Sequence, residues 1–124
     1  TRAMIPADLY RYSPEQRQAL ADDPTTSPAL LRQLAGDSLT WIKVSVASNP
    51  STPEDVLCDL AHTGDTLLRL MIAENPSTPS DLLDELSLTD DPDILFALLT
   101  HPHTSDSLAR SLGKRLHHIE QARG

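Results

Sequence analysis

The sequence has few aromatic residues, a single cysteine and no long apolar run. Its aromatic side chains are Trp41, Tyr10, Tyr12 and Phe96, so the core of a domain of this length must be aliphatic. The lone Cys58 excludes an internal disulfide and any zinc or iron–sulfur site with four cysteines, and it favours a reducing, cytoplasmic location. No apolar stretch approaches the roughly 18 residues of a membrane span, so we expect no membrane partner.

Basic residues are scarce in the middle of the chain. Residues 22–106 contain fifteen acidic side chains against Arg32, Lys43 and Arg69, and the net charge of the whole chain is −8. An acidic surface repels polyphosphate over about one Debye length, which argues against nucleic acid as the main ligand. The balance changes after residue 106, where four basic residues oppose only Glu120.

What the sequence does contain is an internal repeat. Asp23-Pro24, Asn49-Pro50, Asn75-Pro76 and His101-Pro102 recur with a period of 26 residues, and similar segments follow each of them. A fixed period between about 20 and 50 residues is the signature of a solenoid, whose units bury their apolar faces against their neighbours. The pattern therefore predicts one elongated domain.

The first half of each repeat predicts a short amphipathic helix. In the second repeat Thr52 stands where an N-cap is expected, Pro53 takes the first helical position, and Asp55 stands where a capping-box acid would. The third repeat has Thr78 and Pro79 at the same places, whereas in the first repeat Ser-Pro comes one residue later. The apolar stripe of the second repeat is Val56, Leu57, Leu60 and Ala61.

The second half of each repeat is more apolar and predicts a buried helix. Asp65 and Asp91 can cap it, and Pro92 can again take its first position. Such an apolar run is also compatible with a buried strand, but its length of about ten residues and its Ala, Met and Glu content favour a helix. Its apolar residues are Trp41, Ile42, Val44, Val46 and Ala47, then Leu67, Leu68, Leu70, Met71, Ile72 and Ala73, then Ile94, Leu95, Phe96, Leu98 and Leu99.

Each second helix is expected to end at the Asn-Pro joint. Proline moves the preceding residue out of the α region, and asparagine tolerates the left-handed conformation that closes a helix. Residues 14–22 align with a second helix but carry polar residues at most core positions, as terminal repeats do. We expect an N-terminal cap at 1–22, a solenoid at 23–112 and a C-terminal cap helix at 113–124.

The motif Asn-Pro-Ser-Thr-Pro-x-x-(Val/Leu)-Leu-x-x-Leu, followed by a second short helix, resembles the leucine-rich repeat variant family. The resemblance covers roughly residues 23–112 and is closest in the copies that begin at Asn49 and Asn75. It implies an all-α, right-handed superhelix of about three to four two-helix repeats, with α-helices alternating with short α- or 3₁₀-helices and no β-sheet. It implies little about chemistry, because a scaffold does not fix a function.

Equivalent positions of the second helices suggest a row of side chains along the concave surface, where solenoids commonly bind extended partners. The alternative is that Lys43 and Arg69 are simply solvated positions on buried helices. Family members often carry Val-Arg here, so Ile94-Leu95 interrupts any cationic stripe. The predicted row is Thr40, Lys43, Thr66, Arg69, Pro92 and Leu95.

Two other surfaces carry charge. A basic C-terminal patch could contact an acidic partner, another subunit or nucleic acid, or could be an ordinary solvated helix whose charges suit its dipole. The acids of the first helices could steer a basic partner, although acids in first turns are also favoured by helix dipoles. The basic patch is Arg110, Lys114, Arg115, His117 and His118, and the acids are Glu54, Asp55, Asp59, Asp81, Asp84 and Glu85.

Two groups have the spacing of metal ligands. His101 and His103 flank a proline, and Cys58 and His62 are one helical turn apart. We interpret both as incidental, because His101 occupies the Asn position of the joint and Cys58 a position filled elsewhere by Arg32. No catalytic triad order or phosphate-binding loop is present, so we expect no catalytic residue, no cofactor and no metal.

The sequence therefore predicts a non-enzymatic repeat module that binds a protein or peptide, alone or as one domain of a longer chain. The alternative is a helical scaffold associated with nucleic acid, which would use Lys43, Arg69 and the basic C-terminal helix. The oligomeric state is left open by the pattern.

Overall fold

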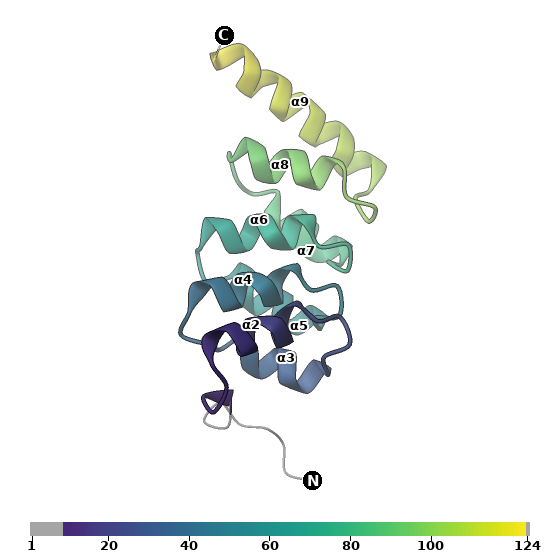
Figure 1. The fold of residues 1–124 in the computed structure, drawn as a ribbon. Helices are drawn as coiled ribbons and strands as arrows, with labels where there is room; N and C mark the ends of the chain where they lie inside the picture. Colours follow the sequence, from purple (N-terminus) through teal and green to yellow (C-terminus); the bar gives the residue numbers. More distant parts are fainter. Residues whose placement is uncertain (1–8, 124) are drawn as a thin grey trace.

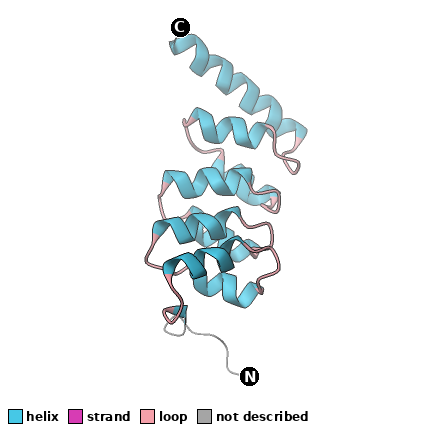
Figure 2. Cartoon of the chain, viewed as in Figure 1, coloured by secondary structure: helices cyan, strands magenta, loops and turns pink. Residues whose placement is uncertain are grey.

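A computed structural model describes residues 9–123, and every regular element in this part of the chain is a helix (Figure 2). The prediction of an all-α fold is confirmed, while the handedness of the superhelix stays a prediction. The helices are α2 (Pro14–Asp22), α3 (Pro28–Leu34), α4 (Thr40–Ser48), α5 (Glu54–Ala61), α6 (Thr66–Glu74), α7 (Ser80–Leu86), α8 (Pro92–Leu99) and α9 (Asp106–Arg123).

The helices form two layers. α2, α4, α6 and α8 lie side by side in a second-helix layer, and α3, α5 and α7 form a first-helix layer behind it (Figure 1). α2 and α9 lie at opposite ends of this elongated stack (Figure 1). The core between the layers is aliphatic, and its fully buried side chains include Leu31, Leu57 and Leu83 from one layer and Ile42, Ile72 and Ile94 from the other.

The first helices begin one residue later than the sequence suggests in the middle repeats. The N-caps predicted at Thr52 and Thr78 are wrong, because Pro53 and Pro79 occupy the N-cap positions without a side-chain bond. Both threonines are buried, and their hydroxyls donate to the carbonyls of Val46 and the equivalent Ile72, each at 2.7 Å. The threonine therefore closes the preceding helix instead of opening the next.

The first repeat is not displaced relative to the others. Ser27 occupies the position of Pro53 and caps α3 by accepting from the amide of Leu30. Among the second helices, the predicted caps at Asp65 and Asp91 are confirmed: the Asp65 carboxylate accepts the amide of Leu68, and that of Asp91 the amide of Asp93.

The asparagines of the joints have a role that the sequence does not reveal. Asn49 (φ −79°, ψ 122°) and Asn75 (φ −74°, ψ 119°) are extended, so the expected left-handed conformation is wrong. The buried amide of Asn75 donates to the carbonyls of Ala47 at 2.8 Å and Asn49 at 2.9 Å, while its side-chain oxygen accepts the amide of Ser77. Asn49 makes the equivalent bonds to the joint before it. Each joint is thus bonded to the preceding one.

His101 reproduces this arrangement in the last joint. Its Nδ1 accepts the amide of His103 at 2.9 Å, and its Nε2 lies 2.7 Å from the carbonyl oxygen of Asn75. Because Nδ1 is an acceptor, the neutral ring carries its proton on Nε2 and can donate it to that carbonyl. The histidine is buried and bonded within the joint, as its alignment with the asparagines predicts.

Asp23 stands in the first joint of the described residues. Its exposed carboxylate accepts from the amide and hydroxyl of Thr25, and these hydrogen bonds, first that of the hydroxyl, lower the pKa of Asp23. The acceptor-only carboxylate thus closes the turn of its own joint.

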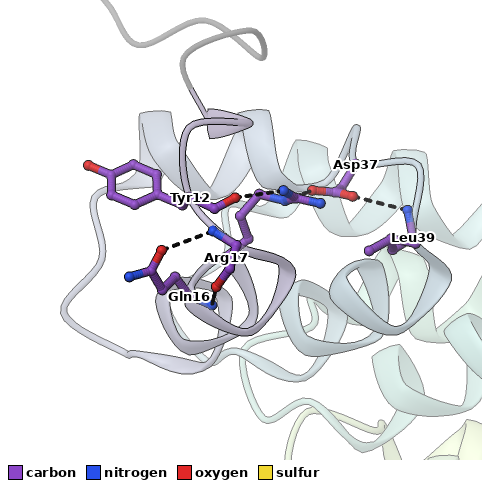
Figure 3. A network of polar contacts seen from close by, with 6 residues as sticks. Tyr12, Gln16, Arg17, Asp37 and Leu39 are labelled. Carbon is purple, nitrogen blue, oxygen red and sulfur yellow. Dashed lines mark hydrogen bonds and ion pairs between the residues drawn. The ribbon is translucent and has the colours of Figure 1, made fainter.

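The N-terminal end is closed by a buried ion pair (Figure 3). Arg17 on α2 donates from Nε to Asp37 at 2.8 Å and from Nη1 to the carbonyl of Tyr12 at 2.9 Å. The second carboxylate oxygen of Asp37 accepts the amide of Leu39, the N-cap residue of α4. The guanidinium also lies 4.5 Å from the ring centroid of Tyr10. This network holds the terminal helix in register with α4.

The C-terminal end is closed by one long helix. α9 runs through Gly113 without a break and packs along α8 (Figure 1). The first helix of the fourth repeat and the cap helix expected after residue 112 are therefore one continuous helix. Arg115 donates to the carbonyl of Thr89 at 2.6 Å and ties α9 to the loop before α8. The division at 1–22, 23–112 and 113–124 stays a prediction, and residues 1–8 and 124 lie outside the described part.

We predict that Asn75→Ala lowers the free energy of unfolding by about 2–4 kcal/mol, because two buried carbonyls lose their donor. Chemical denaturation monitored by circular dichroism measures the effect. Glu74→Ala, at the exposed neighbouring position, is the control and should change stability by less than about 0.5 kcal/mol. Equal effects of the two substitutions would contradict the role assigned to the amide.

His101→Asn should keep the unfolding free energy within about 1 kcal/mol of the parent value, since asparagine supplies the same donor and acceptor. His101→Ala should lower it by about 1–3 kcal/mol, because the carbonyl of Asn75 and the amide of His103 lose their partners. The same denaturation curves compare the two variants. A more stable alanine variant would refute the equivalence of histidine and asparagine here.

Asp37→Ala should cost about 3–5 kcal/mol, because it leaves Arg17 buried and unpaired. Asp55→Ala removes the exposed ion pair with Arg32 and should cost less than about 1 kcal/mol. Thermal melts of both variants test this ranking, and a reversed order would show that the Arg17 network does not support the N-terminal end.

Candidate functional site

The predicted row on the second helices is only partly accessible. Thr40 and Thr66 are exposed at the starts of α4 and α6, while Lys43 and Arg69 are half-buried. Leu95, which occupies the equivalent position on α8, is fully buried. Its expected contact with a partner is therefore wrong, because this position points partly toward the core, where a leucine can be enclosed but a charged group must keep contact with water.

The same helical position in α2 is held by Arg17, whose guanidinium is fully engaged in the buried network with Asp37. Two repeats later Arg69 corresponds to Arg17, and the residue that corresponds to Asp37 is the uncharged Thr89. The Nε of Arg69 is buried and has no hydrogen-bond partner among the described residues. The positions thus hold one structural cation, two half-buried cations and a core leucine, and they do not form a continuous cationic stripe.

The basic C-terminal residues have divided roles. Arg110 and Lys114 are exposed one turn apart on α9, in agreement with a solvated surface. Arg115 is bonded to the Thr89 carbonyl. Of this patch, Arg110, Lys114, His117 and His118 are exposed and can face a partner.

Cys58, His62 and Glu85 lie together on the first-helix layer. The thiol sulfur is 3.7 Å from Nδ1 of His62, whose Nε2 pairs with the carboxylate of Glu85. Partial burial raises the pKa of the Cys58 thiol, and the negative charges of Glu85 and Asp59 raise it further. A thiol with a raised pKa is a poor nucleophile at neutral pH. Within residues 9–123 no group of three or more His, Cys, Asp or Glu side chains is arranged to hold a metal.

Two acids of the first helices contact a side chain of the preceding repeat. Asp55 accepts two bonds from Arg32 across α3 and α5, and Glu85 pairs with His62 across α5 and α7. These contacts give the acidic side chains a local role. The first-helix layer is thus less available to an external cation than its composition suggests.

The second-helix layer exposes large apolar side chains that the sequence led us to place in a buried stretch. Trp41 is 39%, Leu67 48% and Phe96 61% exposed, although all three lie on helices with fully buried neighbours. Trp41 and Leu67 are equivalent positions of α4 and α6, and Val44 and Leu70 are equivalent to Phe96. Residues three apart share one side of a helix. We call Trp41, Val44, Leu67, Leu70 and Phe96 the apolar face.

A signal for this face is present in the sequence. A helix with one buried side needs an apolar stripe of about 100° or somewhat more, whereas the second helices are apolar on nearly all sides. The apolar residues in excess of that stripe have no place in the core. The exposed residues are the ones on the side away from the first-helix layer.

A groove between α6 and α8 continues the apolar face. It is lined by Glu74 at the end of α6, by Asp93 and Phe96 on α8, and by the prolines Pro76 and Pro102 of the two joints. Its walls are therefore a rigid loop on each side and an exposed aromatic ring in the middle. Among the described residues, none of the helices is long and apolar enough to cross a membrane.

The comparisons with known proteins agree with this architecture. The family model described as the Leucine Rich Repeat Variant domain matches residues 43–98, which include α5, α6 and α7 together with most of α4 and α8. Neither the comparison with curated proteins nor that with solved structures gave a match. Residues 43–98 thus match the Leucine Rich Repeat Variant domain, and the all-helical structure of this segment agrees with that match.

Proposed function

We propose that the chain is a non-enzymatic binding module that holds a protein or peptide on the apolar face of its second-helix layer. The observation that carries this proposal is the exposure of Trp41, Leu67 and Phe96 on neighbouring helices. Contiguous exposed apolar side chains on a protein surface typically mark a site of association.

The distribution of aromatic residues supports the same function. The chain has four aromatic residues, and all of them are exposed while the core is built from aliphatic side chains. Aromatic side chains are enriched at protein interfaces, where they contribute much of the binding energy. In this chain the aromatic side chains lie on the surface, where a partner can contact them, and the core contains none.

The alternative of a nucleic-acid scaffold receives less support from the same layer. Every exposed charged residue on α2, α4, α6 and α8 is acidic, and Lys43 and Arg69 are half-buried. Binding to a phosphate backbone requires accessible cations that displace counterions. The exposed Arg110 and Lys114 on α9 are the cations left for that role among the predicted residues. The single cysteine favours a cytoplasmic setting for either partner.

We predict that selection against a phage-displayed library of random 12-residue peptides yields binders of this chain. Phe96→Ala and Leu67→Ala should each weaken their affinity about tenfold or more, measured by fluorescence anisotropy, because each removes an exposed apolar contact. Leu88→Ala is the matched control, since Leu88 is 83% exposed in the turn after α7 and lies outside the apolar face.

Circular dichroism should show that the three variants remain folded, because each changed residue is exposed. Failure to enrich any peptide, or binders that Leu88→Ala weakens as much as Phe96→Ala, would contradict the proposed function. Retention on single- or double-stranded DNA at low salt, lost in Arg110→Ala, would favour the alternative scaffold.

A further inference from the structure

We infer that the segment recognised by the apolar face carries lysine or arginine beside its apolar side chains. This inference rests on the proposed function and specifies the chemistry of the partner. It starts from the groove between α6 and α8, where Glu74 and Asp93 stand beside the exposed ring of Phe96. An apolar anchor flanked by two carboxylates complements an apolar side chain flanked by cations.

Within residues 9–123 neither carboxylate is paired with a cation. The ion pairs join Arg17 to Asp37 and Arg32 to Asp55, His62 contacts Glu85, and none of these contacts involves Glu74 or Asp93. On the first-helix layer Asp55 and Glu85 have such partners, whereas neither acid of the groove does. The charge of the groove is therefore available to a ligand.

The charge is consistent along the whole layer. Its exposed charged residues are Glu15, Asp22, Glu74 and Asp93. The lysine and arginine of α4 and α6, Lys43 and Arg69, are half-buried, and an acidic segment would meet exposed like charge on α2, α6 and α8. A basic segment is attracted over a Debye length before contact, which raises its association rate at low salt.

The groove is also rigid before binding. Pro76 and Pro102 line it, and each follows a joint residue, Asn75 or His101, that is buried and hydrogen-bonded to the joint before it. A preformed groove loses little conformational entropy when it is occupied. The apolar anchor thus supplies affinity, and the acids select the charge of what surrounds it.

Three phage-displayed libraries with the same apolar content test the inference: one rich in Lys and Arg, one neutral and one rich in Asp and Glu. We expect binders from the basic library alone. For a synthetic peptide from that selection, Glu74→Gln and Asp93→Asn should each weaken binding roughly two- to fivefold at low salt, mainly through the association rate. Glu54→Gln, on the first-helix layer, is the matched control and should leave the affinity unchanged.

The outcomes separate this inference from the proposed function. Binders from the neutral or acidic library that depend on Phe96 would overturn the inference while the apolar face remains a binding site. Basic binders insensitive to both Glu74→Gln and Asp93→Asn would overturn it as well. Binding from none of the libraries would contradict the proposed function itself. A dimer that forms in sedimentation and is lost in Phe96→Ala would assign the face to a second copy of the chain.

Discussion

The structure depends on the hydrogen bonds that the buried asparagine of one joint gives to the joint before it. A helix leaves its last carbonyls without partners, and here those carbonyls are covered by the next repeat, where water cannot reach them. The amide of Asn75 supplies donors to two of them and uses its oxygen to close its own turn. One side chain thus satisfies three backbone groups and fixes how one repeat stacks on another.

The same constraint explains which residues are allowed in that position. The position requires an acceptor for the amide two residues later and a donor for a carbonyl 26 residues earlier. A neutral histidine provides both, as His101 does, whereas a carboxylate provides only acceptors. Asp23, in the first joint of the described residues, accepts from Thr25 in its own turn. The residues at this position thus all close their own turn, and the asparagines and His101 also reach the preceding joint.

How much of this could be read from the sequence depends on where the partner atoms lie. The helices, the caps at Asp65 and Asp91 and the aliphatic core follow from local pattern and were predictable. The roles of Thr52 and Asn75 were not, because capping rules consider neighbours in sequence, while Asn75 bonds to carbonyls in the preceding repeat. Equivalent positions also differ in burial: Leu95 is enclosed, but Arg69 keeps part of its surface in water. Alignment of the repeats therefore predicts which way a side chain points better than it predicts the exposed fraction of that side chain.

The stacking also decides which surface is left for a partner. Because the joints hold α4, α6 and α8 side by side, each second helix buries one side against the first-helix layer and its flanks against its neighbours. The remaining side faces solvent, and on it the chain places Trp41, Leu67 and Phe96 instead of the polar residues that solubility alone would favour. A cationic row on the same helices would need accessible charges at positions that the stacking partly buries. The geometry that stabilises the array thus favours an apolar contact with acidic edges over a contact with phosphate.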